Sequence, residues 1–547
     1  MFCNFRIVKL LCWGLCTAVL FGMVGACSRE YHKADADKEV YKIIDSKWHD
    51  SFGQKANYII SDSNIPPSPN DIQIEETVIP PSGVLSLAEA VAIATAQNRN
   101  YQTQKEILYS SALALTGIRH NYEQQWFATI DGAYVDDSIN DDEFSLASAL
   151  KTKQDYILAN GIEIGTELAI DWARYLTGDP RTTLGSVLSA SIAAPLLGIG
   201  PGVPSSKQKW ENLVQKERNV LYAIRTFNRS RKDFVVKAVN AYYEVLQRRD
   251  TVTNTENNYK RVLESKERLE MEAQAGRKTR VDVDEAQQNV LRAQNTLVAA
   301  QERYEQALDG FKIRLALPTD ADIELDQNEL KALEEIGISK PDYTLDEAIE
   351  TALLQRLDLA NTADGIDDVV RNVMLAADGL GPQLNLTGGM NVDSRGRTDF
   401  SQLQFHEGDY TAGFNADLPL DRKTQRNNYR LALISLEDAQ RTYDGAVDNV
   451  KLDVRDAYRD LQETADRYNI ETNSLELAHQ RVETNKLLLD AGRVSVRILL
   501  ASEDALLAAQ NAVTAALVDH LDANLSFYRD VGILQVRPDG MWEQRTL

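Results

Sequence analysis

Side chains that could carry out catalysis or hold a metal ion are scattered through this sequence without the spacing that such sites need. Carboxylate pairs such as Asp282 and Asp284 have no neighbour that marks one of them as an acid or a base. The glycines at 198–202 are spaced Gly-x-Gly-x-Gly around Pro201 and lie in no parallel βαβ pattern, so we interpret them as a strand-to-helix joint. The histidines show no metal-ligand spacing either: His32, His49, His120, His406, His479 and His520. We therefore expect no enzyme, no catalytic residue, no metal and no cofactor.

Two short turns are the residues most suited to binding a partner. The sequence Ala-Gly-Arg at 275–277 recurs 216 positions later at 491–493, and its glycine can adopt the left-handed conformation that ends a helix. The residues after each turn are more apolar than a solvated turn needs, which indicates a covered surface. The alternative is that they pack only within their own helical hairpin. The candidate docking residues are Gly276, Arg277, Val281, Asp282, Val283 and Ala286 in the first turn, and Gly492, Arg493, Val494, Val496 and Ile498 in the second.

The helices after the two turns carry the same sevenfold pattern. Large residues recur every seventh position from Val283 to Phe311 and from Leu499 to Phe527, and the first four of each row are followed three positions later by a small residue. This pattern predicts a coiled-coil seam in which the small row lets a neighbouring helix approach closely. His520 stands in the large row, so packing is its expected role. Before the turns, the proline-free stretches 206–273 and 422–490 each predict one helix that is about 100 Å long at 1.5 Å per residue.

Each copy of this repeat also contains two segments in which apolar and polar residues alternate. They lie at 127–136 and 188–196 in the first copy and at 383–393 and 410–418 in the second. About ten residues with one apolar face and one small or polar face are typical of a membrane β-strand. We therefore predict four such strands in the chain.

The first copy is longer than the second. Matching residues are 258 positions apart at the start of the copies and 216 apart at the turns, so about 42 extra residues lie near 137–183. They include a further alternating segment at 162–172. Each copy must return to the side that it left, which excludes a single unpaired crossing. We interpret the insert as an extracellular β extension rather than part of a barrel wall.

The N-terminus has the pattern of a secretory signal. Arg6 and Lys9 precede an apolar run that ends at Ala26, and no other run approaches the ~18 apolar residues of a spanning helix. The sequence around Cys27 resembles a bacterial lipobox, in which the cysteine becomes the lipidated first residue, and Ser28 after it favours sorting to the outer membrane. The alternative is an ordinary signal with incidental cysteines. All four cysteines fall at or before position 27, so the lipobox interpretation leaves Cys27 alone in the mature chain and no disulfide.

The predicted organisation has six parts besides the insert. They are a signal peptide at 1–26, a lipid-tethered arm at 27–84, repeats at 85–317 and 343–533, an acidic linker at 318–342 and a polar tail at 534–547. We expect the arm to be mostly extended, with a small helix near 39–47 as the alternative. Each repeat opens on a capping box, Ser86 with Glu89 and Thr344 with Glu347, and each opening helix is predicted to run for about 30 residues.

The chain of 547 residues is strongly acidic. It has 59 Lys and Arg against 82 Asp and Glu, a formal net charge of −23. Such a chain repels phosphate groups, so we expect no nucleic-acid partner. The charge is typical of a solubilising surface, or of a lumen that attracts cations.

The whole arrangement resembles the TolC-type outer-membrane efflux proteins over about residues 85–533. The family pattern at the turns reads glycine, then Asp-Val six and seven positions later, then alanine at ten. Gly276, Asp282, Val283 and Ala286 match it at all four places. The Pro-Leu pair after the second strand of each copy also fits the family, and lipidation occurs in one of its large branches.

The second turn departs from the family pattern. Ile498, Leu499 and Ser502 stand at the three positions after Gly492. Family members with a charged gate have carboxylates on this helix, where this chain has Ile498 and Ala501. The resemblance therefore does not extend to that gate.

The resemblance implies a mainly α fold with a β-barrel portion. Three chains would form one homotrimer, with four strands from each closing a 12-stranded barrel in outer-membrane lipid and long helical hairpins forming an α-barrel across the periplasm. The implied function is a passive exit duct that works with a periplasmic adaptor and an inner-membrane pump in a Gram-negative-type bacterium. The alternative is a structural coiled-coil lipoprotein that spans the periplasm without a conducting path. The paired strands discriminate between the two, because a tether has no use for lipid-facing strands.

Overall fold

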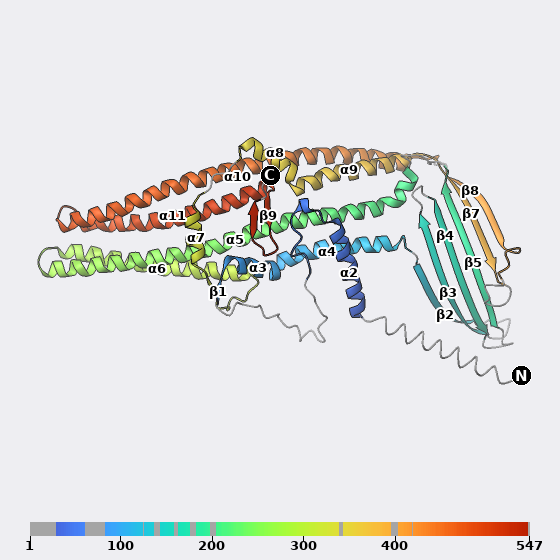
Figure 1. The fold of residues 1–547 in the computed structure, drawn as a ribbon, viewed down its shortest axis with the longest axis horizontal. Coiled ribbons are helices and arrows are strands. Elements are labelled where there is room, and N and C mark those ends of the chain that lie inside the picture. Colours follow the sequence, from blue (N-terminus) through green and yellow to red (C-terminus); the bar gives the residue numbers. More distant parts are fainter. Residues whose placement is uncertain are drawn as a thin grey trace, which may run out of the picture. The chain divides into compact units, whose positions relative to one another are not determined.

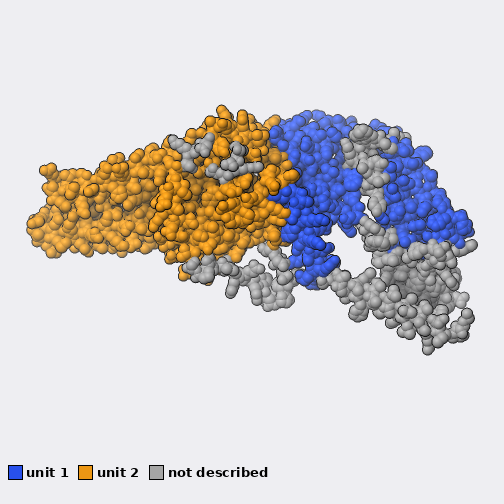
Figure 2. All heavy atoms as spheres, viewed as in Figure 1, with its two compact units in different colours: residues 1–48, 108–224, 363–443 blue, residues 49–107, 225–362, 444–547 orange. Residues whose placement is uncertain are grey.

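The computed structural model describes residues 29–60, 83–123, 125–135, 143–157, 162–175, 182–196, 204–338, 343–394, 403–417 and 420–544. The predicted signal peptide and Cys27 lie outside these ranges. Long helices and one large sheet dominate the chain, as the predicted mainly α fold class requires (Figure 1). The chain forms two compact units, each assembled from three separate stretches (Figure 2). Unit 1 comprises residues 1–48, 108–224 and 363–443, and unit 2 comprises 49–107, 225–362 and 444–547.

Among the described residues, no helix is both long enough and apolar enough to cross a membrane.

Unit 1 contains a six-stranded antiparallel sheet in the order β2-β3-β4-β5-β7-β8 (Figure 1). The four predicted strands are present as β2, β5, β7 and β8, but the predicted number of four is wrong. The strands are β2 Gln125–Val135, β3 Glu143–Ile157, β4 Glu163–Tyr175, β5 Thr182–Pro195, β7 Gln383–Asp393 and β8 Asp409–Asp417.

The two additional strands come from the insert, which supplies two strands of this sheet where one alternating segment was predicted. β3 pairs with β2 from Glu143 to Lys153, and β4 pairs with β5 from Glu163 to Arg174. The insert is thus a hairpin laid between β2 and β5 within the same sheet. The alternating pattern indicated one extra strand, which would leave the chain on the opposite edge of the sheet. Two strands of opposite direction return the chain to the edge from which it started.

Part of the N-terminal arm folds onto unit 1 as helix α2, Arg29–Lys47. The Tyr109 hydroxyl on α4 (Arg99–His120) donates to Asp37 Oδ1 at 2.7 Å, and Lys47 Nζ lies 2.5 Å from Glu217 Oε2 on α5 (Pro204–Gln274). Buried Val40, Ile43 and Ile44 give α2 an apolar face. The expectation of a mostly extended arm is therefore wrong for these residues, and the helix is longer than the alternative at 39–47.

A polar network joins the two repeats inside unit 1, between α5 (Pro204–Gln274) and α9 (Leu357–Asp378). Asp368 is its centre: Arg218 Nε lies 2.5 Å from its Oδ1, and Tyr222 donates its hydroxyl to Oδ2 at 2.8 Å. Arg371 bridges Asp368 and Glu211. Burial alone would raise the pKa of Asp368, but hydrogen bonds from Gln215, Tyr222 and Arg371 and the charge of Arg218 lower it overall.

The opening helices of both repeats are broken, although a single helix of about 30 residues is predicted for each. α3 (Leu87–Gln97) and α8 (Leu345–Gln355) begin at the predicted capping boxes of Ser86 and Thr344. They stop at Asn98 and Arg356, whose backbones leave the helical region. Asn98 accepts a hydrogen bond from the Tyr101 backbone N–H, which caps α4, and donates to the Arg314 carbonyl at 2.7 Å. Its side chain therefore competes with the continuous helix that the apolar spacing predicts.

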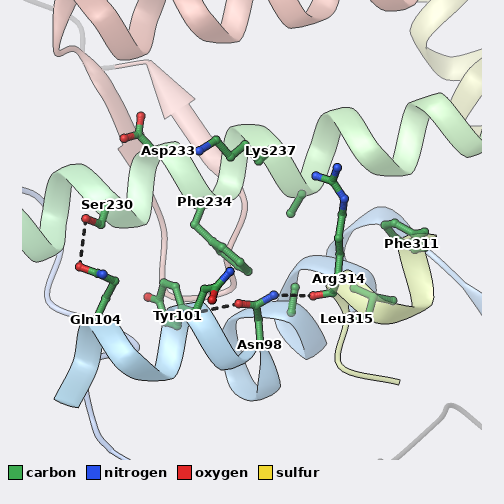
Figure 3. A pocket seen from close by; sticks show the side chains of 13 residues that line it. Asn98, Tyr101, Gln104, Ser230, Asp233, Phe234, Lys237, Phe311, Arg314 and Leu315 are labelled. Carbon is green, nitrogen blue, oxygen red and sulfur yellow. Dashed lines mark hydrogen bonds between the residues drawn. The ribbon is translucent and has the colours of Figure 1, made fainter. Parts of the chain in front are cut away.

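A pocket of about 380 Å³ lies beside this break in unit 2 (Figure 3). Its walls are α4, α5 and the end of α6 (Arg280–Arg314), with Tyr101, Phe234 and Leu315 among the lining residues. Ser230 and Gln104 hydrogen-bond across it at 3.4 Å. We assign no ligand to it.

The predicted linker and tail are folded into unit 2. In the linker, β6 (Glu324–Leu325) pairs in parallel with β1 (Val84–Leu85), and α7 follows at Asn328–Ile336. In the tail, β9 (Leu534–Val536) pairs antiparallel with β10 (Trp542–Gln544). Arg231, which is only 2% exposed, donates to the carbonyls of Ala56 and Val536 at 3.0 and 3.2 Å. One arginine thereby joins the arm, the tail and α5.

Candidate functional site

The two glycine turns have the same backbone geometry. α5 ends at Gln274 before α6, and α10 (Lys423–Asp490) ends before α11 (Val496–Val531). Gly276 and Gly492 have φ values of 74° and 69°, which confirms the predicted left-handed conformation. The N–H groups of Gly276 and Arg277 donate to the carbonyls of Ala273 and Glu272, and those of Gly492 and Arg493 donate to Leu489 and Leu488. This pattern of two backbone hydrogen bonds is the Schellman motif, so both turns end their helices in the same way.

Thr279 and Asp282 together cap the helix after the first turn, and only Asp282 was among the predicted site residues. Thr279 accepts a hydrogen bond from the Asp282 backbone, and the Asp282 carboxylate accepts from the Thr279 backbone N–H and hydroxyl at 3.1 and 2.7 Å. Asp282, chosen for its place in the family pattern, thus has a local role. The second turn has Ser495 at the cap without a side-chain cap bond, and Ile498 occupies the position of Asp282. The Thr-x-x-Asp spacing is the signal that could have identified Thr279.

Some of the candidate docking residues lie in the core between the two hairpins. Ala286 and Val496 are 0% and 1% exposed, and both belong to a cluster of buried apolar side chains. Val494 is half-buried and packs against this cluster. For these three residues, packing within the hairpins accounts for the apolar character. The other buried members of the cluster are Val262, Leu269, Val290, Leu489, Leu499 and Leu500.

Other candidate residues remain on the surface of this chain. Val281 is 72% exposed and Ile498 is 41% exposed, one on each helix that follows a turn. A Cβ added to Gly276 or to Gly492 would meet no heavy atom within 4 Å. The two turns therefore present an open backbone with an exposed apolar side chain nearby. Arg277 and Arg493 are also exposed, whereas Asp282 and Val283 are half-buried.

Ion pairs hold the two hairpins together close to the turns. Arg497 Nε lies 2.9 Å from Glu285 Oε1, and Arg261 Nε lies 2.8 Å from Glu503 Oε2. Both pairs link a residue of the first hairpin to a residue of the second. They place the two turns in one unit of structure, so that the exposed side chains of both belong to a single candidate site.

Metal-binding geometry is not found in the part of the chain that the structure describes. No group of three or more His, Cys, Asp or Glu residues there could hold a metal ion. His520 is 3% exposed and its Nδ1 lies 3.2 Å from Thr464 Oγ1, a position consistent with the predicted packing role. The glycines at 198–202 lie outside the described residues.

Strands followed by a long helical hairpin occur twice in this chain. Three solved structures share this fold. CusC has a TM-score of 0.58 at 14% identity, covering 82% of this chain and 92% of that one. VceC from Vibrio cholerae has a TM-score of 0.56 at 14% identity, covering 82% and 96%, and MtrE from Neisseria gonorrhoeae has 0.55 at 15%, covering 87% and 98%. At these low identities, the similarity shows a shared fold and nothing more.

A known family model matches the second repeat. Residues 348–532 match the family model of outer membrane efflux proteins. The second repeat is thus similar to outer membrane efflux proteins, and the chain shares its fold with solved outer-membrane channels. No curated protein sequence matches the chain.

Proposed function

We propose that this protein is the exit duct of a tripartite efflux or secretion system, a passive path from the periplasm to the exterior. The observation that carries the proposal is the sheet of unit 1, in which even-numbered residues of every strand lie on one face and odd-numbered residues on the other. For example, Leu386 pairs with Phe414, whereas Asn385 pairs with Asn415. One apolar and one polar face suit a wall between lipid and a wet lumen, and a structural tether has no use for such a wall.

The duct requires several copies of the chain. A sheet with free edges cannot span a membrane, because the backbone groups at its edges would have no hydrogen-bond partners in lipid. The helices also leave apolar side chains exposed in the single chain, among them Leu291 and Val298 on α6 and Ile470 and Leu477 on α10. Each pair is seven residues apart, the spacing of a coiled-coil seam. These observations support a homotrimer in the outer membrane of a Gram-negative-type bacterium.

A periplasmic adaptor docks, in this proposal, on the two glycine turns and connects the duct to an inner-membrane pump. The exposed Val281 and Ile498 and the open backbone at Gly276 and Gly492 support this assignment. Val496 and Ala286 are buried, so their role in this proposal is to hold the two helices in position. The adaptor contact should therefore be probed from position 498 rather than from position 496.

Gly276→Asp and Gly492→Asp should each abolish efflux in cells that depend on this duct. The left-handed backbone disfavours a side chain by about 1 kcal/mol, too little to unfold the hairpin, and the added carboxylate projects onto the docking surface. Gly276→Asn is the matched control, because asparagine tolerates this conformation and has nearly the same size without the charge. Efflux assays should be paired with photo-cross-linking from positions 281 and 498. Normal efflux in both aspartate variants, with no cross-link to any adaptor, would contradict the docking assignment.

Lipid on Cys27 is the second part of the proposal, based on the lipobox pattern. Metabolic labelling with a fatty-acid analogue should mark the wild-type protein, and Cys27→Ser should lose the label. The variant should still reach the outer membrane in reduced amount, because the sheet is an independent anchor. Equal labelling of both proteins would disprove lipidation. The relevant measurement is the label per molecule in outer-membrane fractions.

A further inference from the structure

The insert hairpin continues both faces of the sheet without a break. In the register of β4 with β5, Leu168 lies opposite Leu188, which in turn lies opposite Val392 of β7. On the other face, Glu167 lies opposite Ser189, and Ser189 lies opposite Asn391. The same parity holds in β3, where Lys153 pairs with Glu167 on the polar face. An extension outside a membrane would not need an apolar face aligned with that of its neighbours.

The hairpin also runs the full height of the sheet. β2 starts at Gln125 soon after α4, and β5 ends at Pro195 before α5, so these strand ends mark the edge of the sheet that the helices join. By antiparallel register, Ile157 at the end of β3 and Glu163 at the start of β4 lie at this same edge. β3 and β4, with 15 and 13 residues, are as long as the strands beside them. Strands of about 9–11 residues suffice to cross a membrane.

Six strands also satisfy the rule for closing the sheet with copies of itself. In the described part of the chain, β2 and β8 form the two ends of the sheet, each paired on one side. Strand directions alternate along the sheet, so β2 and β8 point in opposite directions. β8 of one copy can therefore pair antiparallel with β2 of the next. An insert of one strand would have forced a parallel pair at every junction, whereas a hairpin preserves the antiparallel order.

We propose that three chains close an 18-stranded barrel, in place of the 12 strands expected from the family resemblance, and that the duct passes correspondingly bulkier cargo. This inference rests on the proposed trimeric duct. Barrel diameter grows roughly linearly with strand number, so the barrel is about 1.5 times as wide as one with four strands per chain at equal tilt. The added wall segment contributes Lys153, Glu163 and Glu167 to the polar face. The cargo class is thus a large, hydrated solute such as a polypeptide or oligosaccharide.

Disulfide trapping tests whether the hairpin lies in the wall. Every native cysteine is at or before position 27, so introduced pairs have no competing thiols farther along the chain. Glu167→Cys with Ser189→Cys, direct register partners, should oxidise to a disulfide in intact cells. Asp131→Cys with Thr183→Cys should not. These two positions become neighbours only if β2 pairs directly with β5, and with β3 and β4 between them they are about 14 Å apart. A disulfide in the second pair and none in the first would overturn the proposal.

A pair of arginine variants tests the face assignment independently. Leu168→Arg puts a charge toward lipid near the middle of the sheet and should abolish recovery of membrane-inserted trimer, whereas Glu167→Arg faces the lumen and should be tolerated. If both variants insert equally well, the hairpin lies outside the lipid and the proposal fails.

Electron cryomicroscopy of the purified oligomer gives the strand count directly. Eighteen strands in three equal groups are expected. A trimer with 12 strands would overturn this inference and leave the proposed duct intact. A protein that is not an oligomeric channel would contradict the proposed function itself. Passage of graded polymers through the oligomer in liposomes, compared with a variant lacking residues 140–178, should show a higher size limit for the complete chain.

Discussion

Asp282 shows how a residue in a family pattern can have a purely local role. Its carboxylate closes a capping box with Thr279, while the equivalent Ile498 closes none with Ser495. These capping bonds account for an aspartate at this position without any contact to a partner. We therefore ascribe to Asp282 the order of the first turn and to Val281 and Ile498 the contact with a partner.

Removing the carboxylate at position 282 and adding one at position 498 should change the stability of the two turns in opposite directions. Asp282→Ala should lower the stability of the first turn of α6 by about 1 kcal/mol, because the Thr279 backbone N–H and hydroxyl lose their acceptor. Ile498→Glu should stabilise the start of α11 by completing a box with Ser495. Amide hydrogen exchange in the first turn of each helix is the measurement. Unchanged exchange in both variants would mean that the caps do not set the order of these turns.

The sequence was informative about the backbone of the turns and less so about their side chains. Gly276 and Gly492 could be predicted because a left-handed residue after a helix is a local property. Val496 and Ala286 could not be separated from Val281, because their burial depends on the other hairpin, more than 200 positions away in the chain. The spacing on one helix does not report which face a distant partner covers.

At the scale of elements, the break between α8 and α9 is held by a buried arginine. Arg356 donates to both carboxylate oxygens of Asp358 at 3.1 and 2.6 Å and to Asp453 Oδ2 on α10 at 2.8 Å. Burial alone would raise the pKa of Asp358, but the hydrogen bonds and the charge of Arg356 lower it overall. The ion pair thus fixes the angle at which the second repeat changes from α8 to α9.

This pair predicts a dependence of stability on pH. The folded-state pKa of Asp358 is lower than its unfolded value of about 3.9, so its contribution is complete above that pH and is lost as the pH falls through the folded pKa. Asp358→Asn should therefore unfold at lower urea concentration at pH 7, and the difference from wild type should shrink below about pH 4. Asp438→Asn, at an exposed carboxylate, is the control and should show no such difference. A constant difference from pH 7 to pH 3 would contradict this assignment.

The strands show which elements sequence patterns can predict and which they cannot. Four were predicted because alternation recurs at matching places in two repeats, and β2, β5, β7 and β8 bear this out. β3 and β4 lie in an insert without a second copy, so no comparison within the chain supported them. The breaks at Asn98 and Arg356 were missed for a different reason, since side-chain hydrogen bonds there override helical spacing.

At the scale of the whole molecule, the exposed seams of α6 and α10 predict the assembly. Ile470→Asp with Leu477→Asp should convert a trimer in detergent into monomers, because a charge buried at an apolar seam without a partner costs several kcal/mol. His479→Asp, about half a turn away around the helix, is the matched control. Light scattering should give a mass near three times that of the mature chain for the wild type. A double variant that remains a trimer would show that these seams do not form the subunit contact.

The division of each unit among three distant stretches also has a consequence for how the protein is made. Arg231 is synthesised 305 residues before Val536, whose carbonyl it binds in the folded unit 2. β9, which supplies buried Leu534 and Val536, leaves the ribosome among the last residues of that unit. Neither unit can fold as one continuous segment during translation, because each is built from three separate stretches. Contacts of such long sequence separation also form slowly. Each unit therefore stays incomplete until all three of its stretches have been synthesised.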